Sequence, residues 1–63
     1  MIRLTRLNDT TITIHADLIE MVEETPDTVV TLTTGRKFIV KEKEQEIRDL
    51  VVSFKREIFI KDL

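Results

Sequence analysis

The residues that could carry chemistry are few and scattered. The single histidine, His15, stands two residues before Asp17. A catalytic histidine needs one group that orients it and another on which it acts. Residues two apart in a strand or turn need not meet, so we interpret His15 as a linking or capping residue.

Three glutamates, Glu20, Glu23 and Glu24, form the densest acidic group. Strand alternation places Glu20 and Glu23 on opposite faces, where they cannot chelate one ion together. They are typical of a solvated strand edge that resists aggregation. Cysteine is absent and histidine occurs once, which excludes disulfides and thiolate metal sites. We therefore expect no catalytic residue, no cofactor and no metal, and we interpret the chain as not being an enzyme.

The charge pattern argues against a strong nucleic-acid footprint. The formal net charge is -2, and the basic pairs Arg36-Lys37 and Lys55-Arg56 lie among acidic residues. Nucleic-acid binding usually needs a basic excess, and aromatic rings for base stacking. Tryptophan and tyrosine are absent, so solvated faces are the better interpretation of both pairs.

The elements that would position any site are short strands. Apolar and β-branched alternation predicts strands over 2–7, 10–14, 18–25, 28–33 and 36–41. Asn8-Asp9 predicts a two-residue hairpin turn, and Gly35 supplies a positive φ at another reversal. The predicted structural turn residues are Asn8, Asp17, Pro26, Asp27 and Gly35.

From residue 43 the period becomes helical. The stripe of apolar residues predicts an amphipathic helix over 43–60, although no capping residue stands at its start. We expect one domain over 1–63, with a β-meander over 1–41. The fold class is α+β: a small antiparallel meander of about five short strands, followed by one C-terminal helix. The stripe consists of Ile47, Leu50, Val51, Phe54 and Ile58.

A second apolar face remains after the core has been assigned. A sheet covered by one helix should be apolar on one face only. Alternation sets Leu18 and Val22 opposite Ile19 and Met21, and leaves open whether Leu18 or Ile19 faces the helix. We interpret the surplus as an interface for self-association or a partner rather than as scattered surface atoms. The candidate interface residues are Ile19, Met21, Val29, Ile39, Val52 and Phe59.

The size of the chain also favours self-association. A domain of 63 residues buries about 60% of the surface that it exposes when unfolded, so a lone core is marginal. With disulfides excluded, a homo-oligomer is the expected remedy. No apolar run approaches the ~20 residues that span a bilayer, and no signal peptide opens the chain. The expectation is a cytoplasmic protein without direct membrane insertion.

The order of these features resembles the FlbD/SwrD (YlzI-like) family of small bacterial flagellar proteins. The opening IRLTRLN is similar to that family's first strand and hairpin, and FKREI to its C-terminus. The segment ADLIEMVEETPDTVVTLTTGRKFIVKE is similar to its central signature. The Pro26-Asp27-Thr28 turn, Leu32-Thr33 and Gly35 are its most specific part. Three residues depart from the family pattern: His15 replaces the usual Asn, Asp9 a common Gly, and Lys43 a frequent capping Ser.

The resemblance implies a role in flagellar motility and swarming, through support of motor or stator output at the cytoplasmic side. Its implied partners are flagellar motor or stator components. The first hypothesis is a non-enzymatic, oligomerising interaction module. The alternative is a small β-rich RNA-binding regulator of flagellar gene expression, against which the acidic balance counts.

Overall fold

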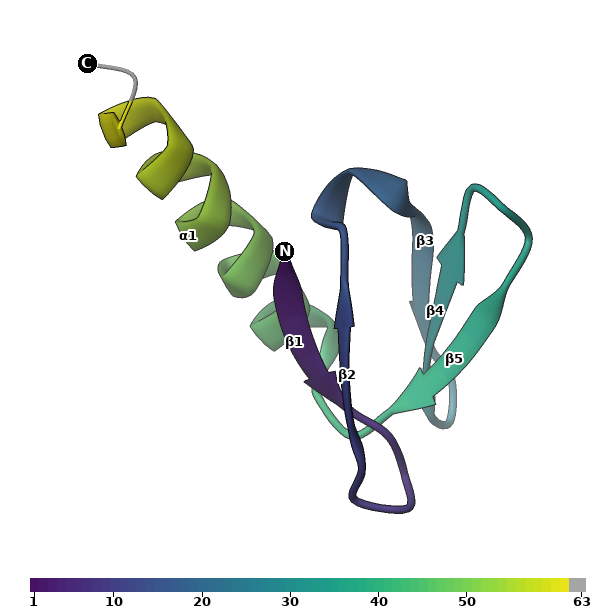
Figure 1. Cartoon of the computed structure of the whole chain (residues 1–63). Coiled ribbons are helices and arrows are strands. Elements are labelled where there is room, and N and C mark those ends of the chain that lie inside the picture. The colour runs from purple at the N-terminus through teal and green to yellow at the C-terminus, as the bar shows by residue number, and fades with distance from the viewer. Residues whose placement is uncertain (62–63) are drawn as a thin grey trace.

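The computed structural model describes the backbone of residues 1–61 and the side chains of residues 1–56. Five antiparallel strands precede one helix, which confirms the α+β class (Figure 1). The strands are β1 (Ile2–Thr5), β2 (Thr11–Ile14), β3 (Ile19–Glu24), β4 (Thr28–Leu32) and β5 (Lys37–Val40). A short 3-10 turn, η1 (Ala16–Leu18), separates β2 from β3, and the helix α1 covers Glu44–Lys61.

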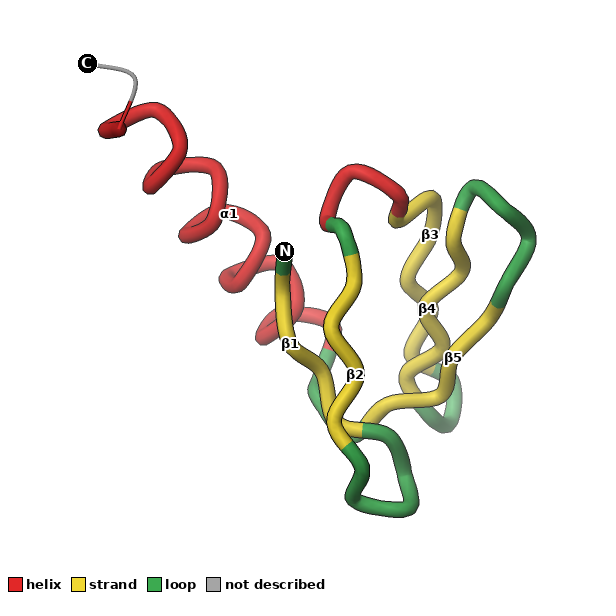
Figure 2. The backbone as a smooth tube through the Cα atoms, in the orientation of Figure 1, coloured by secondary structure: helices red, strands yellow, loops and turns green. Residues whose placement is uncertain are grey.

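The strands form two sheets instead of one continuous meander (Figure 2). β1 pairs with β2, and β4 lies between β3 and β5. The sheets meet at one corner, where an isolated antiparallel bridge joins Arg6 to Val40 and the Lys41 N–H donates to the Thr5 carbonyl at 2.8 Å. β2 and β3 do not pair. The outer edges of β2 and β3 are therefore left without a strand partner, and β1 and β5 approach each other only at this corner.

Two of the hairpins use the same loop. In the first, the Asp9 N–H donates to Arg6 O at 2.9 Å and the Arg6 N–H to Thr10 O at 2.8 Å. The loop therefore has three residues rather than the predicted two, and its last residue, Asp9, has φ 68°. The β4–β5 loop repeats this pattern, with Gly35 at φ 92°. This confirms the positive φ predicted for Gly35, and shows Asp9 holding the conformation that glycine adopts most easily.

The core lies between the two sheets and the first half of the helix. Alternation along β1 and β4 puts Leu4 and Val30 inside, both fully buried, as the strand period predicts. Ile47 is the helical residue in the buried set, as far as the side chains of residues 1–56 are concerned. The buried apolar residues are Ile2, Leu4, Ile14, Ala16, Val30, Leu32, Val40 and Ile47.

The helix covers less of the sheets than its apolar stripe predicts. Its second half runs past them (Figure 1). Val51 and Phe54 are half-buried against the core, whereas Leu50 is 38% exposed. Assigning Leu50 to the buried stripe was wrong, because the helix contacts the sheets along a narrow line through Ile47. The side chain of Ile58 lies outside the described residues.

Candidate interaction surface

Three of the apolar residues predicted to form an interface share the outer face of the three-stranded sheet. Val29 and Ile39 are cross-strand partners, and Met21 is paired with Thr31 in the next row. Met21 and Ile39 expose 44% and 45% of their surface, and Val29 is half-buried. We call Met21, Val29 and Ile39 the outer patch.

Charged residues of both signs border the outer patch. Glu23 is the partner of Val29 on β3, and Lys37 is the partner of Thr31 on β5. Cross-strand partners point to the same face, so both charges stand beside the apolar side chains. An apolar centre with a charged rim is the arrangement of a small protein–protein contact surface.

Ile19 does not belong to the outer patch. The register shifts between Ile19 and Met21, so that Ile19 pairs with Leu32 while Met21 pairs with Thr31. Such a β-bulge inserts one extra residue, here Glu20, and reverses the face of every residue before it. The predicted grouping of Ile19 with Met21 is wrong for this reason. Ile19 shares the core face with Val22 and is half-buried there, while Leu18 is 37% exposed.

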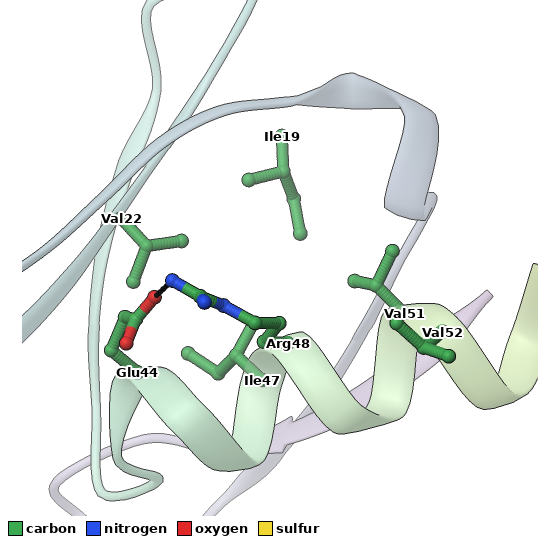
Figure 3. A pocket seen from close by; sticks show the side chains of 7 residues that line it. All are labelled: Ile19, Val22, Glu44, Ile47, Arg48, Val51 and Val52. Atoms are coloured by element: carbon green, nitrogen blue, oxygen red, sulfur yellow. Dashed lines mark hydrogen bonds and ion pairs between the residues drawn. The ribbon is translucent and has the colours of Figure 1, made fainter.

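Ile19 instead helps to line an apolar cleft between β3 and α1, with a volume of about 230 Å³ (Figure 3). Val52, predicted as an interface residue, lies at this cleft and is 50% exposed. An ion pair between Arg48 and Glu44, one helical turn apart, borders it. We call this the helix cleft; its apolar lining is Ile19, Val22, Ile47, Val51 and Val52.

The predicted interface thus divides between two sides of β3. Met21 belongs to the outer patch, and Ile19 lines the helix cleft. The side chain of Phe59, the remaining candidate, lies outside the described residues. Both the outer patch and the helix cleft have room for an apolar side chain of a partner. The outer patch lies on the face of the three-stranded sheet, whereas the helix cleft lies between β3 and α1.

The predicted turn residues lie in loops or in η1, as expected. Asn8 Oδ1 accepts hydrogen bonds from the Thr10 N–H at 3.1 Å and the Thr10 hydroxyl at 2.6 Å. Asp17 lies in η1. Pro26 follows a cis peptide bond, and Asp27 completes the link from β3 to β4. These residues shape the backbone and are not gathered at one site.

The residues first considered for chemistry are also apart. His15 is exposed and precedes η1 without a capping hydrogen bond from its side chain. Asp17 forms an ion pair with Lys55 at 3.8 Å, not with His15. Among the side chains of residues 1–56, no group of three or more histidines, cysteines and carboxylates is placed to hold a metal ion.

The start of the helix has a cap that the sequence did not reveal. Glu24, at the end of β3, accepts a hydrogen bond from the Glu44 N–H at 2.7 Å. The Glu46 carboxylate accepts one from the Lys43 N–H at 3.3 Å. A carboxylate beside the first turn satisfies a free N–H and interacts favourably with the helix dipole. Local spacing could not find Glu24, because it lies 20 residues away.

Glu42 was missed in the same way, although it ends the Val-x-Glu part of the family signature. Its carboxylate accepts the Thr5 N–H at 2.8 Å and the Thr5 hydroxyl at 2.9 Å. Burial acts to raise the pKa of Glu42, but the hydrogen bonds from Thr5 and its own N–H outweigh burial and hold the pKa below its ordinary value of 4.5. Glu42 therefore ties the end of β1 to the segment that enters the helix.

Replacing Glu42 with glutamine should lower the free energy of unfolding by about 1–2 kcal/mol at neutral pH, because the uncharged amide keeps one acceptor oxygen for the two Thr5 donors and loses the charge that strengthens both hydrogen bonds. A depressed pKa gives stability that is complete above the unfolded pKa and lost as pH falls through the folded one. The difference between wild type and Glu42→Gln should therefore shrink below pH 4.5. Urea unfolding across this range measures it, with Glu20→Gln as the exposed control. A difference that stays constant into acid would contradict this role.

A basic and aromatic cluster is centred on Phe38 of β5. The guanidinium carbons of Arg6 and Arg36 lie 5.6 and 5.3 Å from the ring centroid of Phe38. These are cation–π distances. Among the described residues, neither arginine forms an ion pair with a carboxylate within 4.0 Å.

Comparison with known proteins gives one match. The sequence matches the family model FlbD, described as flagellar and swarming motility proteins, over residues 1–59. No curated protein and no solved structure matches the chain. The described part of the chain contains no helix that combines the length and the apolar composition needed to cross a membrane.

Proposed function

Since the chain belongs to the FlbD family of flagellar and swarming motility proteins, we propose that it acts in motility as a non-enzymatic interaction module that supports the output of the flagellar motor. The outer patch is the observation that carries the proposal. Met21 and Ile39 are about half exposed on a sheet face that no other element of the described chain covers. Side chains this apolar at the centre of a charged rim favour a contact surface.

The partner proposed for the outer patch is a motor or stator component at the cytoplasmic side of the flagellum. Membership of the family supports a role in motility, and the charged rim of the outer patch would determine which partner binds. Glu23 and Lys37 offer one charge of each sign beside the patch. Charges at the rim of an interface set orientation and reject wrong partners more than they add affinity. A small apolar centre is consistent with a contact that forms and dissociates during motor operation.

Replacing Ile39 with lysine should abolish the contribution of the protein to motility while leaving the fold intact. Ile39 is 45% exposed, so the substitution costs little stability, but it places a charge at the centre of the patch. Swimming speed in viscous medium should fall to that of a strain without the gene. Circular dichroism and a thermal melt check the fold.

The matched control is Leu7→Lys, which makes the same chemical change at a residue that is 50% exposed in the first hairpin loop and away from the outer patch. This variant should restore motility fully. Full motility with Ile39→Lys, at equal protein abundance, would remove the outer patch from the proposal.

The cluster of Arg6, Phe38 and Arg36 favours the RNA-binding alternative, since guanidinium groups without carboxylate partners suit phosphate. The net charge of -2 opposes it. Gel-shift experiments with flagellar leader RNA at two salt concentrations separate the two functions. The interaction-module proposal expects no salt-sensitive complex, and a tight one would favour the alternative.

A further inference from the structure

The sheet edges formed by β2 and β3 differ in how they are protected. β3 carries three glutamates in six residues and is interrupted by a bulge at Glu20. Charges and bulges are the usual means of preventing an edge from pairing with another strand. β2, with the sequence TITI, carries neither a charge nor a proline, and its pairing with β1 is regular. The β2 edge therefore lacks the protection that the β3 edge has.

The hydrogen bonds show which groups of β2 point outward. The Arg6 N–H donates to Thr10 O, whereas the Thr5 N–H donates to Glu42 and not to its partner Thr11. Bonded and non-bonded pairs alternate along an antiparallel ladder. The pair of Arg3 and Thr13 is consequently non-bonded as well. The N–H and C=O groups of Thr11 and Thr13 thus face away from β1.

These outward groups have no partner among the described residues. No strand pairs with this edge, and no backbone hydrogen bond of the loops and turns uses Thr11 or Thr13. Both side chains are exposed, and Ile12 between them is only half-buried. The edge therefore offers two donors and two acceptors with the spacing of a strand.

We propose that the β2 edge pairs with the β2 edge of a second copy of this chain, in an antiparallel dimer. This inference rests on the proposed function, because it specifies how the module self-associates. The two-fold register sets Thr11 opposite Thr13 of the second copy and Ile12 opposite its own counterpart. Each threonine then exchanges both backbone hydrogen bonds, and the two Ile12 side chains cover one another at the close spacing of a non-bonded pair.

We expect the β2 edge to pair with a second copy rather than with a charged peptide. A symmetric pair also suits β2 better than it suits β3. A two-fold interface brings each residue near the same residues of its partner, so like charges would repel. β2 has no charge to repel, whereas a symmetric β3 pair would oppose glutamates to glutamates. The dimer also adds buried surface to a chain of 63 residues, for which a lone core is marginal.

Thr13→Pro tests the pairing, because proline removes the outward N–H but no hydrogen bond between β1 and β2. Sedimentation equilibrium of the wild-type chain should give twice the 7.4 kDa chain mass, and Thr13→Pro should halve it. Thr13→Val keeps the backbone donor and should stay dimeric. The double variant Thr11→Glu/Thr13→Glu should also be monomeric, because residue 11 lies directly opposite residue 13 of the second copy and glutamates would then face glutamates at both pairs. Arg3, the partner of Thr13 within its own hairpin, supports the monomer fold of this variant.

A wild-type chain that stays at 7.4 kDa at every concentration would overturn the proposal. So would a folded Thr13→Pro chain or a Thr11→Glu/Thr13→Glu chain that remains dimeric. An Ile39→Lys chain that becomes monomeric would also overturn it, since self-association would then belong to the outer patch. The proposal would also be overturned if the β2 edge paired only after a different, extended peptide had been added. The motility proposal fails separately, if cells without the gene swim normally under load.

Discussion

Replacing Leu4 with alanine should unfold most of the protein at physiological temperature. Leu4 is 0% exposed and is among the largest fully buried side chains. Removing a buried leucine side chain costs about 3 kcal/mol or more, because transfer free energy is lost and a cavity remains. A domain this small has little stability in reserve, so a loss of this size is a large fraction of the total.

Circular dichroism during a urea titration measures the effect of Leu4→Ala. Leu7→Ala makes the same chemical change at a side chain that is 50% exposed, and it should stay within about 0.5 kcal/mol of wild type. Equal midpoints for the two variants would show that β1 does not contribute to the core as the structure has it.

Replacing Ile47 with aspartate should separate the helix from the sheets. Ile47 is 2% exposed and is the helical member of the buried core. A buried carboxylate without a partner costs several kcal/mol unless it reaches water, and the helix can bring it to water only by leaving its contact with β1 and β3. The released helix of 18 residues would lose the tertiary packing from which most of the stability of a protein helix comes.

Amide hydrogen exchange is the measurement for Ile47→Asp, with loss of protection expected first along α1. Val52→Asp is the control, since Val52 is 50% exposed on the same helix and the substitution leaves the core contact in place. Exchange that is equally slow in both variants would contradict the view that one buried residue holds the helix.

Features encoded by neighbouring residues were predictable from the sequence. Alternation identified the inward residues of β1, β4 and β5, and the turn residue Gly35 has the positive φ expected of it. The helical period placed α1 within a residue or two of its bounds. Each of these depends on intrinsic preferences of a few adjacent residues.

Features set by contacts across the chain were not predictable. The bulge at Glu20 reverses the face of Ile19, and a period of two cannot show an inserted residue. Glu24 caps the helix, and Glu42 accepts hydrogen bonds from Thr5. Such pairs are visible only once tertiary structure brings distant residues together. Ile19 was separated from the other predicted interface residues for the same reason, because the face on which it lies depends on the register of β3.

The most direct test of the account is the rotation rate of single motors under increasing viscous load, in cells with and without the gene. Filament number, counted by staining, is measured in the same cells. The account predicts normal filaments and a rotation rate that falls more steeply with load when the gene is absent, restored by wild type and not by Ile39→Lys. Equal rotation at every load, with filaments missing or reduced in the deletion, would contradict it and place the protein in expression or assembly of the flagellum.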